Sequence, residues 1–145
     1  MSTIVGTNIE VTNIKYDSDT TSMIISSAGQ ITAQGEGTAT TNLQQGLAKV
    51  WCSATIATNT HTIQDSLNVT SLTDGGAGIT SVVIANDMSN DDYANNVTGR
   101  GSTIVFGSIN DGKYATSTVG IYLFNTSGSL TDATYAITSV HGDLA

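Results

Sequence analysis

Between residues 48 and 57 the sequence alternates strictly between two kinds of side chain. One set is Val50, Cys52, Ala54 and Ile56, and the other is Trp51, Ser53 and Thr55. A repeat of two is the period of a β-strand, whose successive side chains point to opposite faces of a sheet. The segment therefore predicts a strand that buries its aliphatic face in a core.

The composition extends this prediction to the whole chain. Charged residues make up 11% and proline is absent, so Thr, Ser, Asn and Gly fill the polar positions. Threonine is β-branched and favours strands, whereas Ser, Asn and Gly favour turns. We predict an all-β protein whose main part is an antiparallel β-sandwich, with a jelly-roll or an immunoglobulin-like topology.

Further strands are expected at residues 62–72, 78–85, 92–98, 102–109, 114–124 and 134–141, at the spacing typical of a sandwich. The strand at 114–124 differs from the others because both faces of its second half are apolar. Tyr122 and Phe124 lie on one face, opposite aliphatic residues on the other. We expect this strand at the centre of a sheet, covered on both sides.

The N-terminal part predicts a smaller β unit. Residues 4–16 alternate imperfectly, as a strand with a bulge would. Residues 22–26 and 30–34 flank a turn in which Gly29 supplies a positive φ. Residues 34–46 lack periodicity and large apolar groups, so we expect a linker there. The predicted units are residues 1–42, a β-hairpin attachment unit with its linker, and residues 43–145, the sandwich domain.

Charge and cysteine content exclude several classes of function. The formal net charge is −8, which argues against binding to nucleic acid and to anionic membranes. No apolar run approaches the ~20 residues of a membrane span, so no membrane insertion is expected. Cys52 is the one cysteine of the chain, and we expect it to be a small buried hydrophobe. No motif in the sequence calls for a cofactor.

Residues 46–76 read GLAKVWCSATIATNTHTIQDSLNVTSLTDGG. A lysine–aromatic strand at 49–51 is followed at 63–69 by isoleucine, any residue, aspartate, serine, leucine, asparagine and valine. This order resembles a module of tailed-bacteriophage tail fibres and small virion structural proteins. The last predicted strand, AITSVHGD at residues 136–143, resembles the ending of the same modules.

The resemblance implies a non-enzymatic virion protein, assembled in the host cytoplasm and located in the virion. It implies a homotrimer that works in adhesion at a tail fibre or tail tip, with other virion proteins and host surface carbohydrate as further partners. Two alternatives stay open: a trimeric capsid decoration protein, and a lectin-like carbohydrate-binding module. An enzyme that cleaves glycans needs paired carboxylates in a groove, whereas the acidic residues here lie in turns and loops.

Two places are candidates for contacts with partners. The polar loop at residues 86–96 has Asn, Asp and Tyr side chains that suit carbohydrate. Its candidate receptor-facing residues are Asn86, Asp87, Asn90, Asp91, Asp92 and Tyr93. The alternative is a plain strand connection in which Tyr93 packs inward. The second candidate is Trp51, which we expect to be covered by the N-terminal unit or buried at a subunit contact, because a large ring is rarely left exposed.

The two histidines predict no catalysis, and no catalytic residue is assigned. His61 lies in a Thr-rich stretch without a nucleophile motif, so we expect it on the surface. His141 lies in the last predicted strand, where the resembling modules often have an aromatic residue. We expect a packed ring with one hydrogen bond. His141 is also the candidate metal ligand, should three copies of it meet around an ion on a threefold axis.

Overall fold

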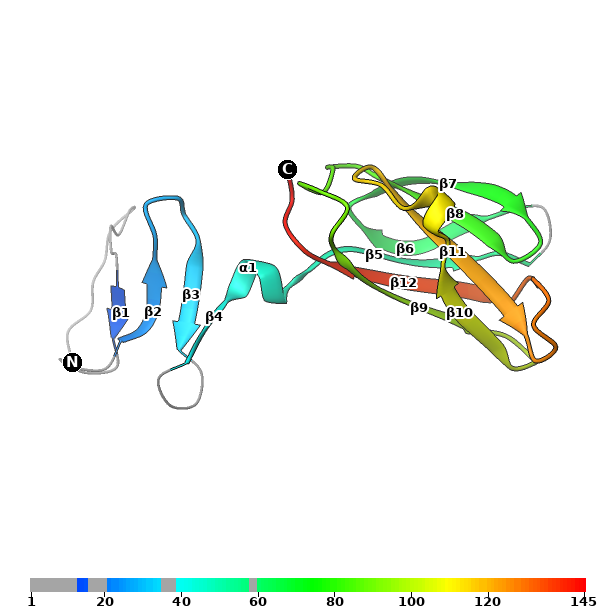
Figure 1. The fold of residues 1–145 in the computed structure, drawn as a ribbon, viewed down its shortest axis with the longest axis horizontal. Coiled ribbons are helices and arrows are strands. Elements are labelled where there is room, and N and C mark those ends of the chain that lie inside the picture. Colours follow the sequence, from blue (N-terminus) through cyan, green and yellow to red (C-terminus); the bar gives the residue numbers. More distant parts are fainter. Residues whose placement is uncertain (1–12, 16–20, 35–38, 58–59) are drawn as a thin grey trace. The chain divides into compact units, whose positions relative to one another are not determined.

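The structure, a computed structural model, describes residues 13–15, 21–34, 39–57 and 60–145. The chain divides into two compact units, Met1–Gly46 and Leu47–Ala145 (Figure 1). The division falls at the end of the segment 34–46, a few residues beyond the predicted domain boundary after residue 42.

The described part of the N-terminal unit forms a sheet in the order β1-β2-β3-β4. Its elements are β1 (Asn13–Lys15), β2 (Thr21–Ile25), β3 (Ile31–Gln34), β4 (Thr40–Asn42) and the one-turn helix α1 (Leu43–Gly46). The predicted hairpin is confirmed, because β2 pairs with β3 and Gly29 between them has a φ of +76°. The predicted linker is wrong in part, since β4 pairs with β3 and the Gln44 side chain accepts a hydrogen bond from the Ile31 N–H at 2.8 Å. The predicted bulged strand at 4–16 lies mostly outside the described residues.

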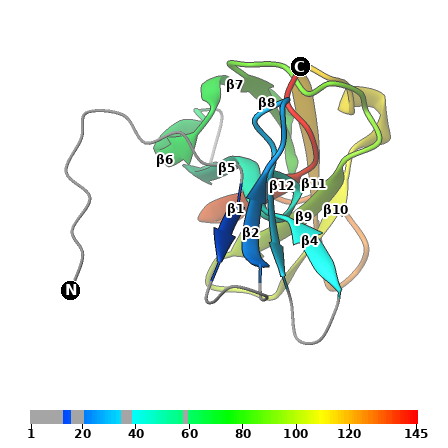
Figure 2. The ribbon, with the colours of Figure 1, turned by 90° about the vertical axis from the view of Figure 1, so that its left-hand side faces the viewer.

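The C-terminal unit is a sandwich of two sheets that lie one over the other (Figures 1 and 2). Its strands are β5 (Ala48–Thr55), β6 (Thr62–Leu67), β7 (Val69–Gly76), β8 (Ile79–Ile84), β9 (Ala94–Arg100), β10 (Val105–Ile109), β11 (Thr118–Asn125) and β12 (Tyr135–His141), and the 3₁₀ turn η1 (Asp111–Lys113) precedes β11. The β5 sheet has the order β6-β5-β12-β9, and the β11 sheet has the order β10-β11-β8-β7. Neighbouring strands are antiparallel, so the predicted antiparallel β-sandwich is confirmed.

Strands that follow one another in sequence are joined in two ways. The pairs β5–β6, β7–β8 and β10–β11 are neighbours within one sheet, whereas β6–β7, β8–β9, β9–β10 and β11–β12 cross between the sheets. At one edge of the sandwich the sheets approach closely, because Gly107 of β10 lies against the backbone of Val97 in β9. The sheets are therefore linked by repeated crossings as well as by their packing.

The core between the sheets is mainly aliphatic. Its buried hydrophobic residues are Val50, Cys52, Ala54, Ile56, Val82, Ile84, Met88, Tyr93, Val119, Ile121, Leu123, Ala133, Ala136 and Val140. The alternation predicted for β5 is confirmed, because its aliphatic set is buried and its second set is not. Tyr93 is the sole aromatic side chain of this core among the described residues, and Tyr114 packs against it. A thin aliphatic layer thus holds the two sheets together.

The structure confirms that β11 lies inside a sheet, but it does not bury both faces of the strand as predicted. β11 lies between β10 and β8, and its inner residues Val119, Ile121 and Leu123 are buried. Tyr122 and Phe124 point to the outer face and are only half-buried. In the single chain the second half of this strand is therefore fully buried on its inner side only.

Asn68 forms a corner that the sequence did not predict, since residues 62–72 were expected to be one strand. Here the chain leaves the β5 sheet and enters the β11 sheet, and Asn68 has a φ of +58°. Its side-chain oxygen accepts the Asn86 backbone N–H at 2.7 Å, and its amide donates to the Asn86 carbonyl at 2.9 Å. The corner is thereby joined to the connection between β8 and β9.

Replacing Asn68 tests this corner. We predict that Asn68→Ala lowers the free energy of unfolding by about 2 kcal/mol, because alanine loses the side-chain bonds and is strained at positive φ. Glycine tolerates this φ, so Asn68→Gly should lower the free energy of unfolding by only about 1 kcal/mol. Urea unfolding followed by the fluorescence of Trp51, the one tryptophan of the chain, reports on the sandwich. An alanine variant as stable as the wild type would contradict this role.

The ionisation of the Cys52 thiol can be used to test whether this residue is buried in the core. The residue is 2% exposed, and burial raises the pKa of its thiol from 9.0 to about 11. The unfolded chain ionises at the lower pKa, so a rise in pH from 9 to 11 favours the unfolded chain. We predict that the free energy of unfolding falls more steeply over this range in the wild type than in Cys52→Ala. Urea titrations at each pH measure the free energy of unfolding of both proteins. If it depends on pH in the same way in both, the thiol of Cys52 is not buried.

Candidate functional site

The sandwich has two ends, which we call the near end, where β5 begins, and the far end, where β5 stops. At the near end His141 of β12 pairs with Ala48, and Met88 bridges to Leu144 close to the C-terminus (Figure 1). The predicted receptor loop at 86–96 therefore lies at the near end, beside the residue where the N-terminal unit joins the sandwich.

Tyr93, one of the predicted receptor-facing residues, points into the sandwich instead. Its residue is 6% exposed, and its hydroxyl lies 2.9 Å from the carbonyl oxygens of both Ala115 and Thr118. Its ring lies 4.3 Å from that of Tyr114, whose hydroxyl donates to the Tyr93 carbonyl. Burial and the neighbouring Tyr114 raise the pKa of Tyr93 to about 12. The receptor-facing role of Tyr93 is therefore wrong, and the inward-packed alternative is correct.

The remaining predicted receptor residues of the loop are Asn86, Asp87, Asn90, Asp91 and Asp92, and all are exposed. Asn86 is fixed by its hydrogen bonds to Asn68, and the Asp92 N–H donates to the Asn90 side chain at 3.0 Å. Met88, between them, is 2% exposed and anchors the loop in the core. Receptor contact by the exposed residues stays a prediction.

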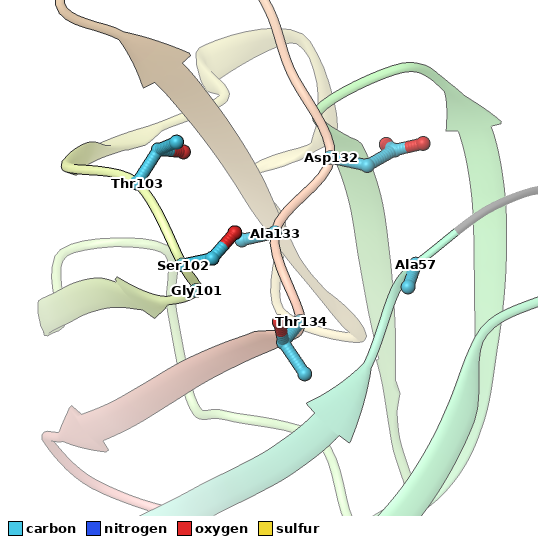
Figure 3. A pocket seen from close by; sticks show the side chains of 7 residues that line it. All are labelled: Ala57, Gly101, Ser102, Thr103, Asp132, Ala133 and Thr134. Atoms are coloured by element: carbon cyan, nitrogen blue, oxygen red, sulfur yellow. The ribbon is translucent and has the colours of Figure 1, made fainter.

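A cavity of about 260 Å³ opens at the far end of the sandwich (Figure 3). Its lining residues are Ala57, Gly101, Ser102, Thr103, Asp132, Ala133 and Thr134. They come from three places in the chain: the end of β5, the connection from β9 to β10, and the connection from β11 to β12. We call it the far-end cavity, and none of its residues belongs to the predicted receptor loop.

A second hollow of about 560 Å³ adjoins the far-end cavity and shares Ser102 and Thr103 with it. Its lining residues are Ser102, Thr103, Ile104, Asn125, Thr126, Ser127 and Thr131. The Asn125 side-chain oxygen accepts the N–H groups of Ser127 and Ser129, each at 3.0 Å, which fixes the turn after β11. The far end therefore presents a mixed polar and apolar surface made mainly by two connections.

Asp132 is held in place by the turn between β7 and β8. Its Oδ1 accepts the Gly78 N–H at 2.7 Å, and the Gly78 carbonyl accepts the Leu123 N–H at 2.8 Å. Gly78 has a φ of +69°, and a Cβ there would lie 2.5 Å from the Leu123 carbonyl oxygen. Only glycine fits these two constraints, so this turn fixes the direction of the Asp132 carboxylate.

The far end can bind a ligand through hydrogen bonds. Its polar side chains are hydroxyls and one amide, which donate and accept hydrogen bonds, and the Asp132 carboxylate, which accepts them. The sequence did not reveal this site, because Ser and Thr are common throughout the chain. The one local signal was the turn Thr126-Ser127-Gly128, where Gly128 has a φ of +76°.

His61 as a whole is half-buried, but its side chain is only 3% exposed, so the expected surface position of the ring is wrong. Nε2 lies 3.5 Å from Asp74 Oδ1, and Nδ1 lies 3.3 Å from Thr80 Oγ1. With its proton on Nε2, the ring donates towards Asp74 and accepts from the Thr80 hydroxyl. Thr80 is 0% exposed, so its hydroxyl cannot reach a substrate. The arrangement of threonine, histidine and aspartate therefore joins the loop before β6 to the β11 sheet and is structural.

Trp51 and His141 both lie on strands of the β5 sheet. Trp51 is half-buried on the outer face, across from Leu67 and Ser139, and its cover by a partner stays a prediction. His141 is half-buried at the near end. Within the described parts of one chain, no three His, Cys, Asp or Glu side chains lie close enough to hold a metal ion. A site shared by three copies of His141 stays a prediction.

Comparisons with protein-family models, curated proteins and solved structures find no significant match to this chain. Among the described residues, no helix has the length and apolar character needed to span a membrane.

The His61 cluster can be tested by paired substitutions. We predict that His61→Ala lowers the free energy of unfolding by about 2 kcal/mol, because it leaves a cavity and a buried Thr80 hydroxyl without its partner. In the wild-type protein the Gly76 N–H donates to Asp74 Oδ1 at 2.7 Å. Asp74→Asn keeps an oxygen that can accept this N–H, so it should lower the free energy of unfolding by less than His61→Ala does. Urea unfolding measures both. A His61→Ala variant with wild-type stability would show that the cluster contributes nothing to the fold.

Proposed function

We propose that this protein is a non-enzymatic structural protein of a phage virion, which assembles as a homotrimer and works in adhesion at a tail fibre or tail tip. The N-terminal unit attaches it to other virion proteins, and the far end of the sandwich contacts carbohydrate on the host surface. The observation that supports this proposal most is the position of the far-end cavity, at the end of the sandwich opposite residue 47.

The position of the cavity matters because attachment leaves one end of a module free. A sandwich held through residue 47 is held at the end where β5 begins, and the far-end cavity lies where the same strand stops. The proposal therefore moves the receptor contact from the loop at 86–96 to the far-end cavity.

The side chains of the far end match the chemistry of a sugar. Hydroxyls of Ser102, Thr103 and Thr134 can donate to and accept from sugar hydroxyls, and the carboxylate of Asp132 accepts from them. Because Asp132 Oδ1 already accepts the Gly78 N–H, the other carboxylate oxygen, Oδ2, is the one that would bind a ligand. Ile104 adds an apolar surface at the adjoining hollow.

The same residues favour binding over glycan cleavage. Glycosidases place two carboxyl groups on either side of the bond that they break. Among the described residues, Asp132 is the only carboxylate that lines the far-end cavity and the adjoining hollow. This supports an adhesive module.

Glycan binding by the purified full chain tests the proposal, with host surface polysaccharide as the probe and calorimetry as the measurement. We predict that Ser102→Trp, which fills the cavity, abolishes binding. Asp132→Asn keeps an acceptor for the Gly78 N–H but loses the charge, so we expect binding about tenfold weaker. The matched control is Asp91→Asn, an exposed near-end carboxylate, which should bind as the wild type does.

Two results would contradict the proposal. No binding by the wild-type chain would remove the adhesive role, and loss of binding in Asp91→Asn alone would return the receptor contact to the near-end loop. Imaging of labelled particles tests the place in the virion separately. Label on the icosahedral faces instead of the tail would support the capsid decoration alternative.

A further inference from the structure

The chain covers only half of the outer face of the β11 sheet. Towards the near end, the segment around η1 packs over Gly120, where a Cβ would lie 2.5 Å from the Asn110 carbonyl oxygen. Asn110 is 4% exposed, and its N–H donates to the Gly120 carbonyl at 3.0 Å. Towards the far end the same face stays open. The open part coincides with the apolar second half of β11.

This open part, which we call the Phe106 face, consists of Ile79, Phe106, Tyr122, Phe124 and Leu130. Phe106 pairs with Phe124 across β10 and β11, Phe124 bridges to Leu130, and Tyr122 pairs with Ile79 of β8. The rings of Tyr122 and Phe124 meet edge to face, with 5.8 Å between their centroids. Two adjacent rows of large apolar side chains therefore lie together on one face.

The Phe106 face is unusually open for side chains of this kind. Phe106 is 57% exposed and Leu130 is 39% exposed, while Tyr122, Phe124 and Ile79 are half-buried. Together they expose on the order of 300 Å² of apolar surface, which is comparable to the largest apolar patch on a typical soluble monomer, and such patches are often functional. That area suits the apolar centre of a subunit interface, with the surrounding Ser and Thr as its polar rim.

Charge distinguishes the Phe106 face from the other outer face. The chain has a formal net charge of −8, so repulsion between two copies is smallest where the surfaces that meet have no acidic side chains. None of the side chains of the Phe106 face is charged at neutral pH. The outer face of the β5 sheet has Lys49 and Asp65 near Trp51, and Arg100 lies over the Tyr135 ring at 3.9 Å. An uncharged face favours a second copy as the occupant, because it is the place where like-charged chains can approach.

We infer that the Phe106 face is the surface on which a second copy of this chain packs. The second copy supplies the outer cover that β11 lacks in the single chain. The inference rests on the proposed homo-oligomer and gives it a contact surface other than Trp51. It does not depend on a place in a virion.

Two matched variants of the full chain test the inference by light scattering. Phe106→Glu and Leu67→Glu each put a carboxylate on an edge strand at a residue that is about half exposed, 57% for Phe106 and 46% for Leu67. Phe106 lies on the Phe106 face, whereas Leu67 lies beside Trp51 on the other sheet. We expect wild-type and Leu67→Glu proteins to be oligomers and Phe106→Glu to have the mass of one chain.

The outcomes separate the inference from the proposal on which it rests. If Leu67→Glu dissociates and Phe106→Glu does not, the contact lies at Trp51, which overturns the inference and leaves the homotrimer. A wild-type protein with the mass of one chain overturns both. If Phe106→Glu keeps the wild-type mass, the inference also fails.

A second pair of variants leaves every apolar side chain in place. Ser108→Cys puts a thiol on the outer face beside Tyr122, and Asp65→Cys puts one on the outer face of the β5 sheet. Both residues are exposed, and the native Cys52 is buried and does not compete. We expect a maleimide to modify Ser108→Cys at least tenfold more slowly than Asp65→Cys. Equal rates would overturn the inference.

Discussion

The structure depends on the contact between two aliphatic sheet faces. Val50, Cys52 and Ala54 of β5 and Val119, Ile121 and Leu123 of β11 are buried in the layer between the sheets, which holds mostly small and medium side chains. Burial of these groups is the main favourable term in folding a chain with so few charges and rings. Because the layer is thin, Tyr93 is the sole ring of its buried core among the described residues. The other large rings of the sandwich lie on its outer faces or at one of its ends.

This distribution gives each surface of the sandwich a different character. The outer face of the β5 sheet combines Trp51 and Tyr135 with charged side chains, whereas the Phe106 face is apolar and uncharged. The near end is closed by Tyr93, Met88 and the C-terminal residues, whereas the far end has the hydroxyl-lined cavity. In the proposed function the far end contacts the ligand, the Phe106 face contacts a second copy, and the N-terminal unit contacts other virion proteins. Each of these contacts uses a separate part of the chain.

The sequence predicted the elements that follow from a local period. The alternation at 48–57 predicted β5 and its buried face, and Gly29 marked the first hairpin. The prediction failed where a single residue changes the path of the chain. Asn68 divides an apparently continuous strand because its side chain bonds to Asn86, which lies far away in the sequence.

The site residues show the same limit. Tyr93 looked like a loop residue, yet its partners are Thr118, which begins β11 in the other sheet, and Ala115 in the segment before that strand. The far-end cavity gathers small residues from the end of β5 and from two distant connections, and no local pattern marks them. The apolar second half of β11 was visible in the sequence, and the missing cover became visible only in the structure.

Hydroxyl-radical footprinting of the full-length protein tests most directly whether these rings are covered by a second copy. In one isolated chain Phe106 is 57% exposed and Tyr93 is 6% exposed. After correction for intrinsic reactivity, we predict that Phe106 is oxidised as slowly as Tyr93, because a neighbouring copy shields it. Oxidation of Phe106 at the rate of a freely exposed ring would contradict this account.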